Sequence, residues 1–141
     1  MRFSAAVIDT NVVVAGLLTG NTESPTAEIL DGMCKVAFPF LLSTALLAEY
    51  REVLLRKKIR TLHTLTEHDV DTLLTVLAAN AIIREPEPRT GAPDTKDDHL
   101  WSLVQSEANC ALVTGDNALM TSPPPKSTVL QPRQFMDLLS E

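Results

Sequence analysis

Short, mainly apolar runs alternate with amphipathic segments along the chain, and this alternation constrains the fold more than any other feature. The apolar runs are too short for typical helices and have the length of buried strands. They lie at residues 5–8, 36–42, 81–83, 110–113 and 128–130. Strands that alternate with helices over short connections form a parallel sheet with helices packed on its faces. We therefore expect an α/β fold, with a central parallel β-sheet flanked by helices on both faces.

Helix start signals separate these strands. Ser24-Pro25 places a capping residue before a proline at the first helical position, and Thr66-Glu67-His68-Asp69 resembles a capping box. After Ser43 or Thr44, apolar residues recur at helical spacing until about Ile59. The predicted helices run from residue 25 to near 32, from 43 or 44 to about 59, from 66 onwards, from 94–98 to about 108, and from 132 onwards.

The size and composition of the chain fit one globular domain over residues 1–141. Apolar residues make up 45% and charged residues 21%, which excludes a disordered or low-complexity chain. The longest apolar stretches of the chain, 11–18 and 73–79, are much shorter than the ~18 residues of a spanning helix, so we expect no membrane segment. Asp9 comes too early for a signal peptide, and Cys34 and Cys110 show no disulfide pattern. These features predict a cytoplasmic protein.

Two aspartates follow the strands that the sequence predicts most clearly. Asp9 comes directly after the run 5–8, and Asp116 follows the run 110–113. Residues just beyond the carboxyl ends of parallel strands line the ligand crevice, so we expect both carboxylates to face the same crevice. An aspartate after a strand is also typical of a helix N-cap, and for either residue alone this alternative stays open.

Helical periodicity selects two further acids. Glu49 lies three and four residues from apolar positions, so it borders the apolar face of its helix, although a solvated face is the usual place for a glutamate. Counted from Asp97, the positions three, four, seven and eleven residues on are all apolar, whereas from Asp98 most of them are polar. We therefore expect Asp97 on the inward stripe and Asp98 on the polar side. The alternative is a capping box with Asp94 as its cap.

These acids stand in short motifs that occur in a definite order. The motifs are Val7-Ile8-Asp9-Thr10-Asn11, Ser43 to Glu49, Asp94-x-x-Asp97-Asp98 and Leu112-Val113-Thr114-Gly115-Asp116. Their order and their positions after predicted strands resemble the PIN domain, most closely its VapC-like branch of toxins from prokaryotic toxin–antitoxin pairs. The resemblance runs from Val7 to the last helix and implies a single PIN-like domain.

Carried over motif by motif, the resemblance implies a set of site residues. The acids are Asp9, Glu49, Asp97 and Asp116, and the polar neighbours are Asn11 and Thr114. Lys96 departs from the pattern, because this branch often has an acid there, and a lysine at this point could pair with one of the acids. The choice between Asp97 and Asp98 therefore stays open.

Four carboxylates around one crevice repel one another at reduced dielectric, and a divalent cation relieves this repulsion. A set without Cys or His favours the hard ions Mg²⁺ or Mn²⁺. Two such ions, ~3.5–4 Å apart, would clamp the attacking and leaving oxygens at a phosphorus atom. Asp9 and Asp97 are then the best candidates for metal ligands, Glu49 for a ligand of the second ion, and Asp116 for a ligand or the residue that orients the attacking water.

The resemblance implies a Mg²⁺- or Mn²⁺-dependent endoribonuclease that cuts single-stranded or looped RNA, the toxin of a type II toxin–antitoxin pair. It also implies a cognate antitoxin as protein partner and allows a homodimer. Two alternatives stay open: a catalytically silent PIN-like module that binds RNA or serves as a scaffold, and a phosphatase or phosphoacceptor domain with Asp9 as nucleophile. A phosphatase of this kind would require a lysine shortly after a late strand, and no lysine closely follows the strand 110–113. The three histidines have no zinc-site spacing.

Charge is unevenly distributed along the chain. The net charge of −6 argues against a broad cationic surface for nucleic acid. The bases Arg51, Arg56, Lys57, Lys58 and Arg60 nevertheless lie within ten residues that contain a single acid, Glu52. On a helix continuing from Glu49, Arg56 would lie ~10 Å further along the same face and hold a phosphate near the cleaved one. The alternative is ordinary surface charge, with Glu52 paired to Arg56.

Overall fold

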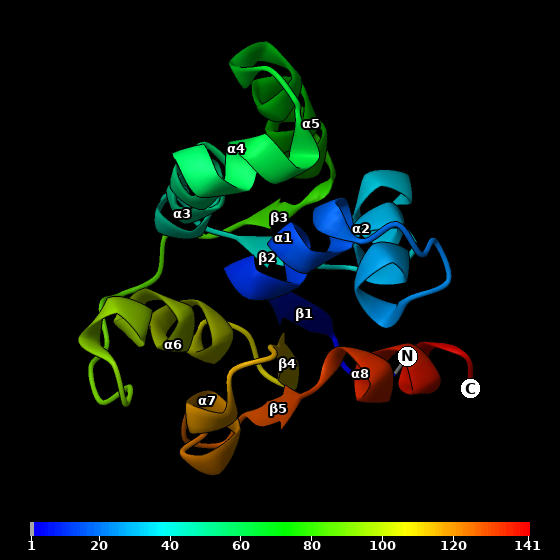
Figure 1. The fold of residues 1–141 in the computed structure, drawn as a ribbon. Coiled ribbons are helices and arrows are strands. Elements are labelled where there is room, and N and C mark those ends of the chain that lie inside the picture. Colours follow the sequence, from blue (N-terminus) through cyan, green and yellow to red (C-terminus); the bar gives the residue numbers. More distant parts are fainter. Residues whose placement is uncertain (1) are drawn as a thin grey trace.

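Five parallel strands lie at the centre of the molecule in the computed structural model, which describes residues 2–141. The strands are β1 (Ala5–Ile8), β2 (Leu41–Leu42), β3 (Ile82–Ile83), β4 (Cys110–Val113) and β5 (Thr128–Leu130). One ladder has the order β1-β4-β5, and a second ladder pairs β2 with β3. A single bridge between Ala6 and Phe40 connects the ladders, which gives the order β3-β2-β1-β4-β5 across the fold (Figure 1).

Helices cover this sheet on both sides. They are α1 (Thr10–Leu18), α2 (Pro25–Lys35), α3 (Thr44–Leu54), α4 (Lys57–His63), α5 (Glu67–Asn80), the 3-10 turn η1 (Thr95–Asp97), α6 (Asp98–Gln105), α7 (Asn117–Thr121) and α8 (Pro132–Leu139). In Figure 1, α3 and α6 lie on one side of the strands and α2 and α8 on the other. The predicted α/β fold with a central parallel sheet is therefore confirmed. Within residues 2–141, no helix is both long and apolar enough to span a membrane.

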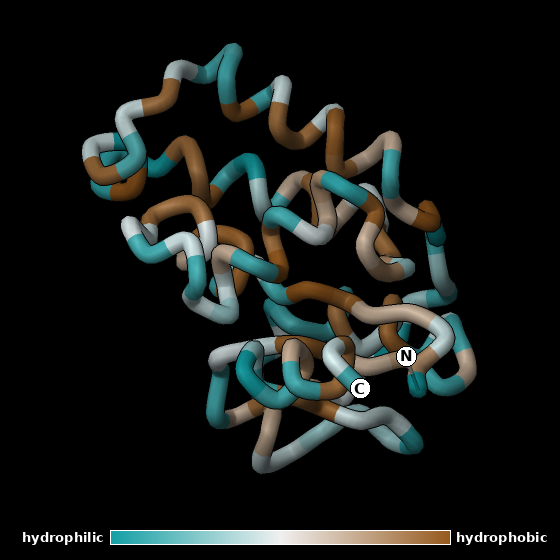
Figure 2. Tube along the Cα trace, turned by 90° about the vertical axis from the view of Figure 1, so that its right-hand side faces the viewer, coloured by the Kyte–Doolittle hydropathy of each residue, from teal (hydrophilic) through white to brown (hydrophobic). Residues whose placement is uncertain are grey.

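The core forms where the apolar runs are enclosed. All residues of β1 and β4 are buried, as expected for the central strands of a parallel sheet. Phe135 of α8 is completely buried, and its ring centre lies 5.0 Å from that of Phe38 in an edge-to-face contact that helps to hold the last helix in place. Figure 2 shows apolar segments gathered towards the interior and hydrophilic segments along the outer turns.

The segment between α2 and β2 differs from its predicted structure. The predicted strand over 36–42 is wrong in its first half, because α2 continues past Gly32 to Lys35 and Val36 ends it in the left-handed region (φ 57°). Gly32 lies inside the helix, where a Cβ would come within 2.9 Å of the Phe38 ring. The glycine therefore permits a close approach and does not end the helix. Only Leu41–Leu42 remain as a strand.

The predicted helix from 43 or 44 to about 59 is wrong in its length. Helix α3 ends at Leu54, Arg56 leaves the helical region (φ −60°, ψ 135°), and a separate α4 begins. His63 stabilises this break, because its Nε2 lies 2.8 Å from the carbonyl oxygen of Leu54, which has lost its partner in the helix. The helix predicted to about 108 also ends earlier, at Gln105, and the chain then turns through Asn109 in a left-handed conformation (φ 58°) into β4.

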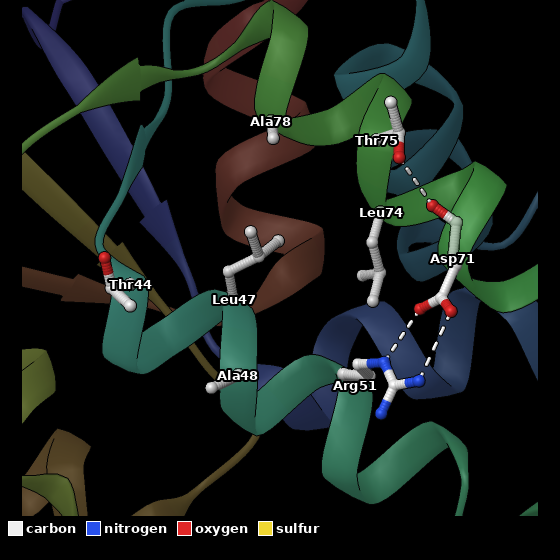
Figure 3. Close-up of a pocket in the computed structure, with 8 residues that line it drawn as sticks. All are labelled: Thr44, Leu47, Ala48, Arg51, Asp71, Leu74, Thr75 and Ala78. Atoms are coloured by element: carbon white, nitrogen blue, oxygen red, sulfur yellow. Dashed lines mark hydrogen bonds and ion pairs between the residues drawn. The ribbon is translucent and has the colours of Figure 1, made fainter.

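Helix α3 carries one of the predicted site acids and is fixed against α5. Arg51 of α3 donates to Asp71 (2.8 Å) and to Glu67 (2.6 Å) of α5, while Leu47 and Leu74 line the groove between the helices (Figure 3). Exposed ion pairs of this kind add little stability, but they orient the two helices. Arg51 is therefore engaged by α5 and does not belong to a free basic surface.

Candidate active site

Asp9 lies at the carboxyl end of β1 and is the N-cap of α1. The residue is only 6% exposed, so its carboxylate needs partners within the protein. Oδ1 accepts from the Thr10 N–H (2.8 Å), and Oδ2 accepts from the Thr114 hydroxyl (2.7 Å) and the Asn11 amide (3.2 Å). Burial raises the pKa of Asp9, and the hydrogen bonds from Thr114 and Thr10 offset part of the effect. Asp9 is thus the N-cap of α1, as the alternative prediction has it, and the three hydrogen bonds hold its carboxylate in a defined position.

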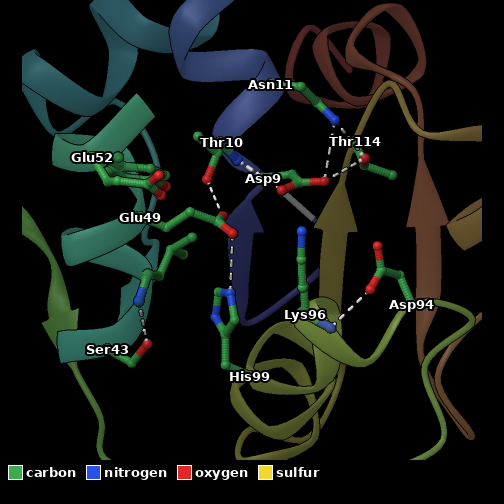
Figure 4. Close-up of polar contacts among 12 residues, drawn as sticks. Asp9, Thr10, Asn11, Ser43, Glu49, Glu52, Asp94, Lys96, His99 and Thr114 are labelled. Carbon is green, nitrogen blue, oxygen red and sulfur yellow. Dashed lines mark hydrogen bonds and ion pairs between the residues drawn. The ribbon is translucent and has the colours of Figure 1, made fainter. Parts of the chain in front are cut away.

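Asp116 lies three residues beyond the end of β4. It is the N-cap of α7 and accepts from the Ala118 N–H at 2.9 Å. The Thr114 hydroxyl, which donates to the first aspartate, also accepts from the Asp116 N–H at 2.9 Å. Asn11 adds a second link, because its side-chain amide oxygen accepts a hydrogen bond from the Gly115 N–H at 3.1 Å. The predicted polar neighbours therefore tie the ends of β1 and β4 together (Figure 4).

Glu49 reaches the same region from α3 and is half-buried. One of its carboxylate oxygens accepts a hydrogen bond from the Thr10 hydroxyl, and the other lies 3.4 Å from Nε2 of His99 on α6. Figure 4 shows the carboxylate between these two partners. The His99 contact lowers the pKa of Glu49, and the same contact raises the pKa of His99. Both shifts favour the charged forms and hold the carboxylate ionised.

Asp97 and Asp98 face different cavities. Asp97 lines the cavity of the other three acids, and within residues 2–141 its carboxylate accepts no hydrogen bond. Burial, and then the neighbouring carboxylates, raise the pKa of Asp97 to about 6. Asp98 instead accepts from the Ala92 N–H at 3.1 Å and lines a separate cavity. The capping box is incomplete, because Asp94 accepts from the Lys96 N–H at 3.0 Å without a returning bond from Asp97.

Four predicted acids from distant parts of the chain line one open cavity of about 490 Å³. They are Asp9, Glu49, Asp97 and Asp116, and Asn11 and Arg56 line it with them. The structure thus brings together the acids that strand ends and helical periodicity single out. It leaves Asp98 outside this cavity, half-buried against the loop residue Ala92.

The donor set of this cavity consists of oxygens, which fits a hard divalent ion such as Mg²⁺ or Mn²⁺. Within residues 2–141, no three acidic, histidine or cysteine side chains stand close enough to enclose a metal directly. Mg²⁺ commonly takes one or two carboxylates and keeps several waters, so the wider arrangement still fits it. A cation here would relieve the repulsion that helps to raise the pKa of Asp9 and of Asp97.

Arg56 lies in the turn between α3 and α4. The prediction that Arg56 continues the helix of Glu49 is wrong, because α3 ends at Leu54. The turn nevertheless places Arg56 in the lining of the acidic cavity. Its guanidinium also donates to Glu52 at 3.0 Å, so the surface pair is present as well. Lys57, Lys58 and Arg60 follow on α4, and the structure of residues 2–141 gives none of them an ion pair.

Thr10 and His99, the two partners of Glu49, escape prediction from the sequence. Thr10 has one signal, its place inside the Asp9-Thr10-Asn11 motif, and His99 has none beyond lying two residues after Asp97. Lys96 is expected near the acids, but over residues 2–141 it forms no ion pair with any of them.

A comparison with known protein families agrees with this geometry. A family model described as the PIN domain matches residues 5–118, which include all four acids of the cavity. The match runs from β1 to the start of α7, the elements that position these acids. A search of proteins with curated functions finds no match. Because the family model covers most of the chain, the chain belongs to the PIN-domain family.

Proposed function

We propose that this protein is a Mg²⁺- or Mn²⁺-dependent endoribonuclease that hydrolyses phosphodiester bonds in RNA. PIN domains are typically nucleases and generally use divalent metal ions, so the family supports a hydrolase at a coarse level. The observation that carries the finer proposal is the convergence of Asp9, Glu49, Asp97 and Asp116 on one cavity at the carboxyl ends of β1 and β4. Oxygen donors around an open cavity suit a metal ion and a phosphate backbone.

The four carboxylates would play different parts in this reaction. Mg²⁺ or Mn²⁺, when bound, would supply positive charge at the phosphate oxygens. Asp9 is held by three donors and would keep its position as a ligand, whereas Asp97 accepts no hydrogen bond within residues 2–141 and is free to turn towards the ion. Glu49 is oriented by Thr10 and His99. Asp116 has one oxygen engaged by α7, and its other oxygen would orient the attacking water.

We further propose that the protein is the toxin of a toxin–antitoxin pair, with a cognate antitoxin as its partner and the cytoplasm as its place of action. The motif resemblance to VapC-like toxins supports the toxin role. Cys34 and Cys110 are both free thiols, and burial raises the pKa of Cys110 to about 12, as suits a structural cysteine in a reducing compartment. A homodimer stays part of the proposal, and size-exclusion chromatography with light scattering tests it.

The test is cleavage of a mixed RNA pool with Mn²⁺ by the wild type and by Asp9→Asn, Asp97→Asn and Asp116→Asn. Each substitution removes charge that would hold the ion, so we expect rates to fall by more than ~100-fold, beyond the ~10–100-fold loss typical of an outer-sphere partner. Asp98→Asn is the matched control, because Asp98 lines a different cavity, and it should cost much less. Circular dichroism verifies that every variant is folded.

Three outcomes would count against the proposal. RNA binding without cleavage by the wild type would favour a catalytically silent RNA-binding module. Full activity in one of the Asp→Asn variants would remove that residue from the site. A larger loss in Asp98→Asn than in Asp97→Asn would assign the third acid to Asp98.

A further inference from the structure

A second cavity, of about 250 Å³, lies beside the acidic one. Helix α3 contributes Ala45, α6 contributes His99 and Ser102, and the loop between β3 and η1 contributes Pro86 and Arg89. Apart from His99, which orients Glu49, no residue of this cavity has a part in the proposed hydrolysis. Its volume is below the ~300–1,000 Å³ of pockets for drug-sized ligands, which suits a single planar ring system.

The two cavities share a wall. Ala45 lies one turn before Glu49 on α3, ~6 Å along the helix axis, and therefore on the same face. His99 lines the second cavity, while its Nε2 lies 3.4 Å from Glu49 at the edge of the first. Figure 4 shows the His99 ring beside the Glu49 carboxylate, to which a dashed line joins it. A strand of RNA with its scissile phosphate at the acids would thus have a neighbouring base within reach of the second cavity.

The loop wall of the second cavity is built in place by side-chain contacts with α6. The Arg89 N–H donates to the Ser102 hydroxyl at 2.8 Å, and the Ala92 N–H donates to Asp98 at 3.1 Å. Gly91 (φ 114°) lies against Trp101, where a Cβ would come within 2.9 Å of the indole ring. Only glycine adopts this conformation readily and fits this contact. The cavity therefore exists before any ligand arrives.

The lining has the chemistry that binds an unstacked base. Proteins hold such bases against imidazole rings and guanidinium planes and bond their edges through polar groups. His99 supplies an imidazole, and Arg89 supplies a guanidinium that has no ion pair within residues 2–141. Glu85 and Asp98 each use one carboxylate oxygen, for Thr44 and for Ala92, and have a second oxygen left to accept. Acceptors of this kind favour an exocyclic amine, which uracil lacks.

We propose that this second cavity binds the base next to the scissile phosphate and selects adenine, cytosine or guanine over uracil. The inference rests on the proposed nuclease function, because that function places the phosphate at the acids. Occupation of the cavity would help to position the backbone for cleavage, so the base preference would appear in the rate of cutting as well as in binding.

The test is sequencing of cut ends from a random RNA pool treated with wild type, Ala45→Phe and Ala48→Phe. Ala45→Phe fills the second cavity, whereas the matched control Ala48→Phe lies on the same helix but lines the groove against α5. We expect wild type and control to disfavour uracil at one position beside the cut. Ala45→Phe should lose this preference and cut the preferred RNA about five- to a hundred-fold more slowly, the usual effect of losing one stacked base. Equal preferences in all three proteins would overturn the proposal.

A binding measurement separates this proposal from the nuclease proposal. Backbone amide chemical shifts are followed during titration with 5′-AMP and with 5′-UMP. Shifts at residues 43–45, 89 and 102 that are larger with 5′-AMP support the base site, even if no RNA is cut and the nuclease proposal fails. Shifts confined to the ends of β1 and β4, or equal for both nucleotides, would show that the second cavity binds no base selectively and would overturn the proposal.

Discussion

The carboxylates of the acidic cavity differ in how the surrounding residues hold them. Asp9 is enclosed by three donors at the end of a buried strand, and Glu49 is oriented by a threonine and a histidine. Asp97 has no such support within residues 2–141, and its pKa of about 6 reflects burial beside other carboxylates. When an acid with a raised pKa ionises, the free energy of unfolding falls. The cavity therefore lowers the stability of the fold, and in return it holds negative charge that can bind a cation.

Asp97→Asn should therefore stabilise the metal-free protein at pH 7.5. The pKa of Asp97 is above its ordinary value of 3.8, so the folded state binds more protons than the unfolded state between about pH 4 and 6, and stability falls as the pH rises through this window. The variant should melt a few degrees higher than wild type at pH 7.5, and the difference should vanish near pH 4. Asp98→Asn, which keeps an oxygen acceptor for the Ala92 N–H and lines a different cavity, is the control measured beside it. A gain that is equal at both pH values would contradict this reasoning.

At the scale of elements, the short helix α4 brings a basic surface beside an acidic cavity. The break after α3 directs the chain so that Arg56 lines the cavity and Lys57, Lys58 and Arg60 continue along α4. We refer to these four residues as the basic strip. Arg56 also pairs with Glu52, but an exposed pair of this kind is weak and can exchange for a phosphate. The strip is therefore placed to hold RNA on one side of the acids.

Replacing Arg56, Lys57 and Arg60 together with alanine should weaken RNA binding and flatten its salt dependence. Each phosphate contact with a single strand contributes ~0.7 to the slope of log affinity against log salt, so the slope should fall by about 2. The matched control replaces Lys35, Lys126 and Arg133, which do not line the acidic cavity. Affinity for a short RNA at several salt concentrations is the measurement. If both triple variants keep the wild-type slope, the RNA lies elsewhere, with Arg84 and Arg89 as the next candidates.

At the scale of the whole molecule, the acidic cavity joins elements that lie far apart in the sequence. The ends of β1 and β4, the middle of α3 and the start of α6 all contribute a carboxylate. Their mutual repulsion acts only in the folded state, where they are close, and an ion that binds there therefore stabilises the entire fold.

Mn²⁺ should accordingly raise the melting temperature of the wild type. At a concentration about 100-fold above its Kd, an ion that binds only the folded state adds ~2.7 kcal/mol, which corresponds to about 5–10 °C for a domain of this size. Asp9→Asn should reduce the shift, whereas Asp31→Asn, on a surface aspartate paired with Lys35 on α2, should leave it unchanged. Differential scanning fluorimetry measures both. An identical shift in Asp9→Asn and wild type would place the ion outside this cavity.

Local patterns in the sequence determined the strands, most helix starts and the placement of the acids relative to them. The uniformly apolar β1 and β4 could be predicted because central parallel strands are buried on both faces, and Asp9 and Asp116 follow at their ends. Helical periodicity separated Asp97 from Asp98, and the structure places them in two different cavities. These features depend on a few neighbouring residues, so they can be predicted from the sequence without knowledge of the fold. The roles of the acids in catalysis stay predictions.

Tertiary structure alone decided the features that depend on contacts between distant segments. Helix α3 ends at Leu54 because His63, nine residues later, satisfies the carbonyl group that the break exposes. Glu49 meets Thr10 and His99 only because α1, α3 and α6 pack around the same sheet edge. A hydrogen bond across 39 or 50 residues leaves no periodic trace in the sequence, since its geometry is determined by how whole elements pack against one another.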